Sequence, residues 1–213
     1  MLVQTNHQPT APTGEAGFLQ GSSTADQATL LAQDIEESVL AERKGGTVFA
    51  DLTAACNTVW HRGLTCKLPR WLPDRHTVHM IMEMVGNCSF TLTTSKRRRL
   101  RSFKNGVPQG SVLAPLVFNI CTYDLPTTVS EKYAYADDLA IVHADGDWHA
   151  VEDVPSKDMA TVGEYLQTWK LKLSTAKTVS ATLYLNNCEA KRELKFKFNN
   201  ETCPTAPSPN TLE

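Results

Sequence analysis

The chain contains 213 residues, of which 41% are hydrophobic and 21% are charged, and its formal net charge at pH 7 is −2. This composition excludes a fully disordered chain, and the length suits one domain with its own buried core. The apolar runs are too short to cross a bilayer and the first residues do not form a signal peptide, which predicts an intracellular protein with no membrane partner. The slightly acidic balance alone argues mildly against a nucleic-acid binder.

Cysteines and basic residues follow different patterns along the chain. The six cysteines are scattered without the paired spacing of a zinc site, so we expect reduced thiols and no disulfide partner. In contrast, six of the 21 Lys and Arg residues lie within Ser95–Lys104, where there is no acidic residue. This run is a candidate contact for a polyanion.

Hydrophobic spacing and turn residues predict one α+β domain at residues 17–200, between a polar tail at 1–16 and an irregular tail at 201–213. Ser23 and Asp26 form a capping pair for the first helix, which the glycines at 45 and 46 are expected to end. Further helices are predicted at Asn57–Leu68 with Pro69 limiting it, from Asp74, from Ser111 to about Asp124, and at Asp158–Trp169. Strands are predicted at Thr47–Ala50, Ser89–Thr94 with the basic run as its hairpin partner, Glu131–Tyr135, Leu139–His143, Thr178–Leu185 and Leu194–Phe198.

Three aspartates stand at the ends of predicted strands. Asp137 and Asp138 occupy the tip of a predicted hairpin, and Asp51 ends an apolar strand. Adjacent carboxylates repel each other, and a divalent cation with oxygen ligands relieves that repulsion. The alternatives are a solvated acidic turn for the pair and a helix cap or a turn for Asp51. A strand ending at Asp51 beside the hairpin would favour the cation site.

The segment Asn105–Ser111 is predicted to be a stiff turn that leads into a helix. Pro108 restricts the backbone, and Gly110 removes a Cβ where another backbone or a base could approach. Ser111 begins a helix whose N-terminus attracts phosphate. An ordinary turn between a loop and a helix is the alternative.

Three blocks in this order carry a resemblance to a known family: Val48–Asp51 (VFAD), Asn105–Pro115 (NGVPQGSVLAP) and Tyr135–Asp138 (YADD). Together they resemble the reverse transcriptases of non-LTR, LINE-type and jockey-like retrotransposons, over about Glu15 to Asn200. The resemblance implies the fingers and palm of a right-hand polymerase, with an antiparallel palm sheet packed on helices. It also implies an RNA-directed DNA polymerase that uses an RNA template, a DNA primer and deoxynucleoside triphosphates.

The resemblance assigns a role to each of the three acids. Asp51 and Asp137 would hold two Mg²⁺ ions, with Mn²⁺ as a substitute, and Asp138 would support them. The backbone carbonyl of Leu52 would help to bind the ion on the nucleotide side. Such a pair of ions acidifies the primer 3′-hydroxyl and carries the triphosphate and the leaving pyrophosphate. A nuclease that uses two metal ions is also conceivable from three carboxylates, although nothing else in the sequence favours it.

Four further positions would contact the nucleotide by resemblance. Gln109 and Gly110 would touch the incoming nucleotide and the template. Cys56 stands where the family usually has an aromatic residue that excludes the 2′-hydroxyl of a ribonucleotide. Lys177 matches a palm lysine that protonates pyrophosphate, and a solvated surface lysine is its alternative.

The basic run has two interpretations. Arg97, Arg98, Arg99 and Arg101 would bind template phosphates, which require charge but no reading of base sequence. The alternative is a solvated hairpin edge that prevents aggregation. We favour the phosphate contact.

Several positions depart from the family pattern. Cys56 is smaller than the usual aromatic residue, Asn57 replaces an Asp, and residues 17–22 lack the cations expected to hold the triphosphate. A primer-grip hairpin and a thumb would normally follow the palm, and an endonuclease would precede it. These differences predict a truncated, partly degenerate copy with weak sugar discrimination and low processivity. The alternatives are an inactive relic that keeps the palm fold and at most binds RNA, and a chain that does not fold stably alone.

Overall fold

The computed structural model describes residues 23–86, 88–94, 97–102, 104–108, 110–183, 194–198 and 201–205. These residues form an α+β fold with antiparallel strand pairing. The helices are α1 (Thr24–Leu40), α2 (Ala55–Thr58), α3 (His61–Trp71), α4 (Arg75–Gly86), α5 (Leu113–Thr122) and α6 (Trp148–Thr168). The strands are β1 (Lys44–Asp51), β2 (Ser89–Thr94), β3 (Arg97–Ser102), β4 (Glu131–Tyr135), β5 (Asp138–Asp145), β6 (Val179–Leu183), β7 (Lys197–Phe198) and β8 (Glu201–Thr202).

The main sheet has four strands in the order β4-β5-β1-β6, so that β1 lies between β5 and β6. In the antiparallel pair of β1 and β5, Lys44 lies opposite Asp145 at one end and Asp51 lies opposite Asp138 at the other. Burial alternates near the end of β1, because Val48 is 0% exposed whereas Phe49 is 36% exposed. Side chains of successive strand residues point to opposite faces of a sheet, so the side chain of Asp51 lies on the same face as that of Phe49.

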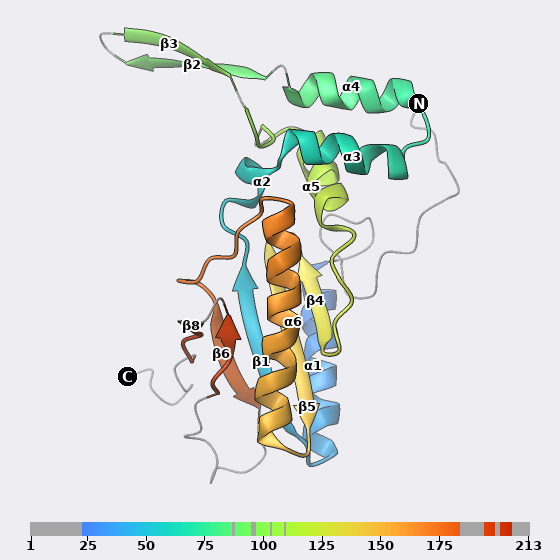
Figure 1. Cartoon of the computed structure of the whole chain (residues 1–213), viewed down its shortest axis with the longest axis vertical. Helices are drawn as coiled ribbons and strands as arrows, with labels where there is room; N and C mark the ends of the chain where they lie inside the picture. The colour runs from blue at the N-terminus through green and yellow to red at the C-terminus, as the bar shows by residue number, and fades with distance from the viewer. Residues whose placement is uncertain are drawn as a thin grey trace.

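Helices cover the sheet on both sides (Figure 1). α6 lies across one face, and α1 lies against the other face beside β1 and β4. A Cβ added at Gly46 would lie 2.8 Å from Cγ1 of Val151 in α6, which shows how closely this helix approaches β1. Among the described residues, no helix combines the length and the apolar character that crossing a bilayer requires.

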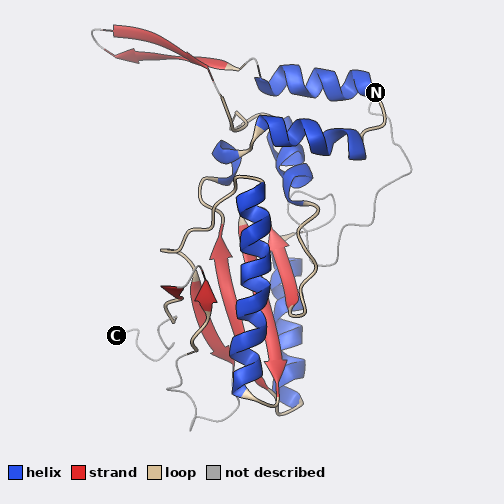
Figure 2. Ribbon diagram, viewed as in Figure 1, coloured by secondary structure: helices blue, strands red, loops and turns tan. Residues whose placement is uncertain are grey.

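A helical layer lies beyond the end of the sheet where β1 stops (Figure 1). Figure 2 shows α2, α3, α4 and α5 there, with the β2–β3 hairpin extending from the end of α4. Leu64 and Leu68 of α3, Ile81 of α4, and Val117 and Phe118 of α5 are buried in the same core as the sheet residues. The layer therefore stands against the open end of the sheet, next to Asp51.

The local signals predicted several elements correctly. Ser23 and Asp26 form the predicted capping box at the start of α1, and Asp74 accepts hydrogen bonds from the backbone of His76 and Thr77 at the start of α4. β2 and β4 have the predicted bounds. These elements depend on neighbouring residues alone, which is why the sequence suffices to place them.

Pro69 does not limit its helix as predicted, and a second helix also contains an internal proline. α3 passes Pro69 and ends at Trp71, and α6 contains Pro155 and begins at Trp148 instead of Asp158. A proline inside a helix removes one backbone hydrogen bond. Pro155 is buried, and the apolar face of α6 packs on the sheet, so tertiary packing outweighs the local cost.

Other predicted helix ends were also wrong. The helix predicted at Asn57–Leu68 is two helices, α2 and α3. The glycines at 45 and 46 lie inside β1 and do not end α1, which stops at Leu40. α5 begins at Leu113, and Ser111 is not its first residue, although the Ser111 hydroxyl accepts a hydrogen bond from the Leu113 N–H at 3.2 Å.

Strand bounds differ near the C-terminus. β5 already includes Asp138, and β6 begins at Val179 instead of the predicted Thr178. Residues 184 and 185 of the predicted strand lie outside the described residues. Within Leu194–Phe198 only Lys197–Phe198 is a strand, although Leu194 and Phe196 are each 1% exposed. The alternating pattern at Leu194 and Phe196 therefore reflects burial, and strand pairing is confined to Lys197–Phe198. β8 lies in the tail that was predicted to be irregular.

Candidate active site

The three acids meet where β1 ends and the turn between β4 and β5 begins. Asp51 is the last residue of β1 and lies directly opposite Asp138, the first residue of β5. Residues that face each other in an antiparallel pair point to the same side of the sheet. Asp137 precedes Asp138 in the turn, and its carbonyl accepts a hydrogen bond of 2.8 Å from the N–H of Leu52. Three carboxylates therefore come from adjacent backbone segments.

The electrostatics of the site reflect this crowding. The pKa of Asp138 is raised, first by burial and then by the negative charges of Asp137 and Asp51. Lys177 partly compensates for these charges, because its Nζ lies 2.8 Å from Oδ2 of Asp51. The hydrogen bond to Asp51 is also the main reason that the pKa of Lys177 is raised. The site thus joins an excess of negative charge to one exposed ammonium group.

Oxygen donors of this kind suit a hard divalent cation such as Mg²⁺. Burial is the main cause of the raised pKa of Asp138, and the charges of Asp137 and Asp51 add to it, so a cation beside this carboxylate would relieve the repulsion. In the described part of the chain, however, no three His, Cys, Asp or Glu side chains converge closely enough to hold a metal ion. The donor chemistry therefore fits Mg²⁺, while the side-chain conformations are those of an ion pair between Asp51 and Lys177.

The turn predicted at Asn105–Ser111 docks on the helix that carries Cys56. Val107 N–H donates to the Cys56 carbonyl and Gly106 N–H donates to the Val59 carbonyl, each at 2.8 Å. Gly106 has a φ of 84°, and a Cβ there would lie 2.6 Å from the Asn57 carbonyl oxygen, so only glycine fits. Burial, followed by the charge of Asp137, raises the pKa of the Cys56 thiol. Cys56 therefore lies within the electrostatic field of the acids.

The sequence profile of the family described as "Reverse transcriptase (RNA-dependent DNA polymerase)" matches residues 2–198. The chain belongs to the reverse transcriptase family. It is 27% identical over 179 residues to the "Probable RNA-directed DNA polymerase from transposon BS" of Drosophila melanogaster. It is 25% identical over 181 residues to the "RNA-directed DNA polymerase from mobile element jockey" of Drosophila funebris. The predicted relationship to jockey-like non-LTR elements is confirmed.

These alignments cover 79% and 80% of this reverse transcriptase chain, respectively, and 20% of each relative. The chain thus spans about a fifth of the length of the curated relatives that it matches. Among solved structures, the telomerases of Candida albicans and Candida tropicalis resemble it with TM-scores of 0.58 and 0.60 and identities of 13% and 12%. The matches cover 86% and 94% of this chain, respectively, and 34% of each telomerase chain. They show a shared fold.

Of the two residues predicted to touch the nucleotide and the template, Gly110 is among the described residues and Gln109 is not. Gly110 has a φ of 86°, and a Cβ added there would have no atom within 4 Å. Among the described residues, none therefore occupies the space that a side chain at position 110 would fill. Gln109 lies outside the described residues, as does the predicted fingers block at 17–22.

The basic hairpin extends beyond α4, away from the sheet (Figure 1). Its register pairs Arg101 with Phe90 and Arg99 with Leu92, so these side chains share a face with Arg97. Arg98 points to the opposite face. All residues of both strands are exposed. The four predicted arginines therefore form two unequal surfaces.

A large cleft lies apart from the acids. It has a volume of about 1030 Å³ and runs along α6, where its lining includes Lys157, Lys170, Lys172 and Lys197. Asp51 and the two turn aspartates are not among its lining residues. Asp137 and Asp138 are exposed, so the candidate active site of this reverse transcriptase domain lies at an exposed end of the sheet, where both aspartates border a small hollow with Leu52.

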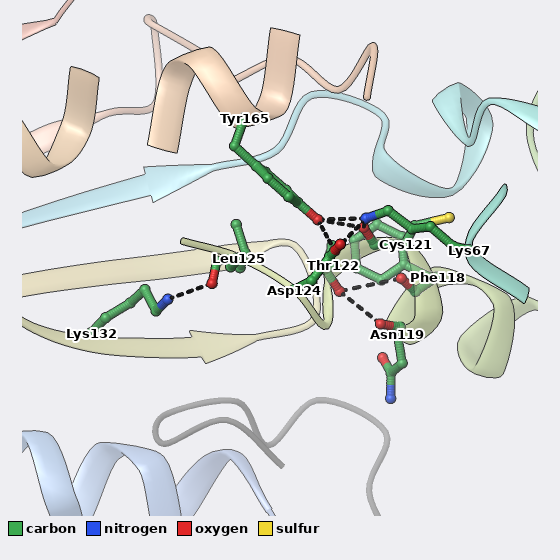
Figure 3. Close-up of polar contacts among 9 residues, drawn as sticks. All are labelled: Lys67, Phe118, Asn119, Cys121, Thr122, Asp124, Leu125, Lys132 and Tyr165. Atoms are coloured by element: carbon green, nitrogen blue, oxygen red, sulfur yellow. Dashed lines mark hydrogen bonds and ion pairs between the residues drawn. The ribbon is translucent and has the colours of Figure 1, made fainter. Parts of the chain in front are cut away.

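Sequence reasoning did not identify a buried polar cluster around Lys67, which Figure 3 shows. Lys67 of α3 is 2% exposed and forms an ion pair with Asp124, which follows α5. Tyr165 of α6 hydrogen-bonds to both. The available signal was the position of Lys67 three residues after Leu64, on the apolar face of its helix, where a lysine needs a partner.

Proposed function

We propose that this domain performs RNA-templated DNA synthesis by transferring a nucleotidyl group to a primer 3′-hydroxyl. The observation that carries the proposal is the register that sets Asp51 opposite Asp138, with Asp137 in the adjoining turn. Membership of the reverse transcriptase family supports the same reaction. An inactive relic is not favoured, because all three carboxylates are present and come from adjacent segments.

Asp51 and Asp137 would hold two divalent ions, Mg²⁺ or Mn²⁺, with Asp138 in support and the Leu52 carbonyl on the nucleotide side. When bound, such ions lower the pKa of the attacking hydroxyl and neutralise the triphosphate and the leaving pyrophosphate. The protein supplies the rigid frame, since the N–H of Leu52 attaches the acidic turn to the end of β1. Positioning of this kind accounts for much of catalysis in phosphoryl transfer.

Lys177 would supply a proton to the leaving group. Its raised pKa keeps Nζ protonated, and its side chain is 70% exposed, so the ammonium can move from Asp51 to a bound pyrophosphate. Cys56 would line the sugar position, with Gln109 and Gly110 near the nucleotide and the template. The RNA template would bind the hairpin arginines through its phosphates.

The test is Mg²⁺-dependent primer extension on an RNA template. Asp51→Asn and Asp138→Asn should each lower the extension rate roughly a hundredfold or more, because each removes charge from the site of the reaction. Asp145→Asn is the matched control, because Asp145 lies at the far end of the same strand, opposite Lys44. Equal rates in wild type and both site variants would contradict the proposal, and so would a folded wild type without extension.

A further inference from the structure

The ammonium group of Lys67 is buried among hydrogen-bond acceptors (Figure 3). An ammonium group has three protons to donate. Nζ donates to the Cys121 carbonyl and to Oδ1 of Asp124 at 2.5 Å each, and to the Tyr165 hydroxyl at 2.6 Å. The ring centroids of Trp169 and Tyr165 lie 3.9 Å and 4.8 Å from Nζ, respectively. Every donor of this cation therefore has an acceptor, and two aromatic rings lie against it.

The cluster joins three separate parts of the fold. Lys67 belongs to α3, Cys121 to the last turn of α5, and Tyr165 to the last turn of α6. The Cys121 carbonyl lies at the end of α5, where carbonyl groups lack helical partners and favour a cation. Burial lowers the pKa of Lys67, and the hydrogen bond and charge of Asp124 oppose that change. The cluster thus connects the helical layer to the helix that covers the sheet.

The residues after α6 lead directly from this cluster to the acids. Trp169 caps α6, and Leu171 N–H returns to the Leu166 carbonyl at 2.8 Å. The chain then runs beside the end of β1, where Thr53 N–H donates to the Lys172 carbonyl at 2.7 Å. Ser174 N–H donates to the Asp51 carbonyl at 2.8 Å. Three residues further on, Lys177 reaches the carboxylate of Asp51.

The contact between α3 and the end of α6 has little free space. A Cβ added at Gly63 of α3 would lie 2.6 Å from Cε3 of Trp60 and 3.1 Å from Cε3 of Trp169. Real Cβ atoms do not approach ring carbons to 2.6 Å, so glycine is needed for this approach. The segment toward Lys177 begins at Trp169. Two residues of α3, Gly63 and Lys67, therefore contact this tryptophan and fix its position.

We propose that Lys67 is a positioning residue for nucleotidyl transfer. By fixing the end of α6 against α3 and α5, it holds the segment 170–177 beside β1 and thereby sets Lys177 against Asp51. The inference rests on the proposed function, because its consequence for catalysis passes through Lys177. Its structural part, the attachment of this segment to β1, is measurable without any reaction.

Amide hydrogen exchange of the full chain tests the structural part. Lys67→Met keeps the length of the side chain but removes its charge, and it should speed exchange of the Thr53 and Ser174 amides about tenfold relative to Val48 in β1. Lys132→Met is the matched control, because Lys132 donates to the Pro126 carbonyl and belongs to β4. Uniform acceleration at all three amides, or none, would overturn the proposal.

A double-mutant cycle in single-nucleotide addition tests the catalytic part. Lys67→Met and Lys177→Met should each slow addition at saturating nucleotide, and the double variant should be no slower than the slower single variant. Effects that multiply would overturn a role through Lys177. If Lys67→Met fails to fold, Tyr165→Phe takes its place, because it removes the bridging hydroxyl but keeps the ring. It should likewise speed exchange of the Thr53 and Ser174 amides relative to Val48. An inactive wild type would contradict the proposed function, and the exchange experiment would still decide the structural part of this inference.

Discussion

Single residues at the acidic end of the sheet carry opposing demands. The pKa of Asp138 is raised by burial and by its acidic neighbours, which means that the folded protein resists its ionisation. The same repulsion is what makes the three carboxylates suitable for a divalent cation. Lys177 offsets part of the charge at Asp51 but leaves the turn acids without an equivalent partner among the ion pairs of the described residues. Stability and the proposed chemistry therefore conflict at this point.

Asp138→Asn should stabilise the protein at pH 7 in the absence of divalent cations. A carboxyl group with a raised pKa contributes stability that is present below its ordinary value of 3.8 and is lost as the pH rises through the raised value. At neutral pH the folded state bears the full repulsion, and the amide removes it. Thermal unfolding measures the difference in stability between Asp138→Asn and wild type, with Asp145→Asn as the control. This difference should disappear in acid. A lower unfolding temperature for Asp138→Asn at pH 7 would contradict this account.

Cys56 offers a second prediction at the scale of one residue. A small thiol at the predicted sugar position leaves room for a 2′-hydroxyl, so wild type should discriminate weakly between ribonucleotides and deoxyribonucleotides. Cys56→Phe should raise the preference for deoxyribonucleotides about tenfold or more, because an aromatic ring would clash with the additional hydroxyl. Primer extension with each of the two substrates measures this preference. The control is Cys66→Phe, on the exposed face of α3. An unchanged ratio would show that Cys56 is not at the sugar.

At the scale of elements, the β2–β3 hairpin separates its arginines by face. Arg97, Arg99 and Arg101 lie on alternate positions of one strand, about 6.8 Å apart, with Phe90 and Leu92 on the same face. Charge and an aromatic ring together suit the phosphates and bases of a single strand. A two-stranded hairpin alone is marginally stable in water, so a bound strand would also stabilise this element.

Arg99→Ala should therefore weaken RNA binding more than Arg98→Ala. Both variants remove one charge from neighbouring residues of β3, so binding governed only by net charge would respond equally to each. Contact with phosphate through one face predicts that Arg99→Ala also reduces the slope of log affinity against log salt by about 0.7, whereas Arg98→Ala leaves it nearly unchanged. Fluorescence titrations of single-stranded RNA at several salt concentrations measure both quantities. Identical effects of the two substitutions would support the solvated-edge interpretation of the hairpin.

At the scale of the whole molecule, the acids lie at the junction between the sheet and the helical layer. One continuous core contains Val48 of the sheet, Val162 of α6 and Leu64 of α3. The turn that begins with Gly106 docks on α2, and the Lys67 cluster attaches α3 to α6. The geometry at Asp51 therefore depends on contacts made in both layers, although its own recorded contacts are with β5 and the segment after α6.

Much of the site was predictable from local patterns. The hairpin tip at Asp137, the strand that ends at Asp51 and the basic hairpin all follow from alternation and turn residues. Predictions failed where a local rule met a tertiary contact. Pro155 lies inside α6 because the helix is held on the sheet, and Leu194 has the pattern of a strand because it is buried. The order of the blocks also identified the family correctly.

The sequence by itself determined which residues could do chemistry and on which short elements they stand, because capping, alternation and turn preferences act between near neighbours. Only the tertiary structure decided that β1 lies between β5 and β6, so that Asp51 faces Asp138. It also decided that Lys67 reaches Tyr165, 98 residues away in the chain. Contacts over such separations are selected by burial and strand register across the whole fold, and no local preference encodes them.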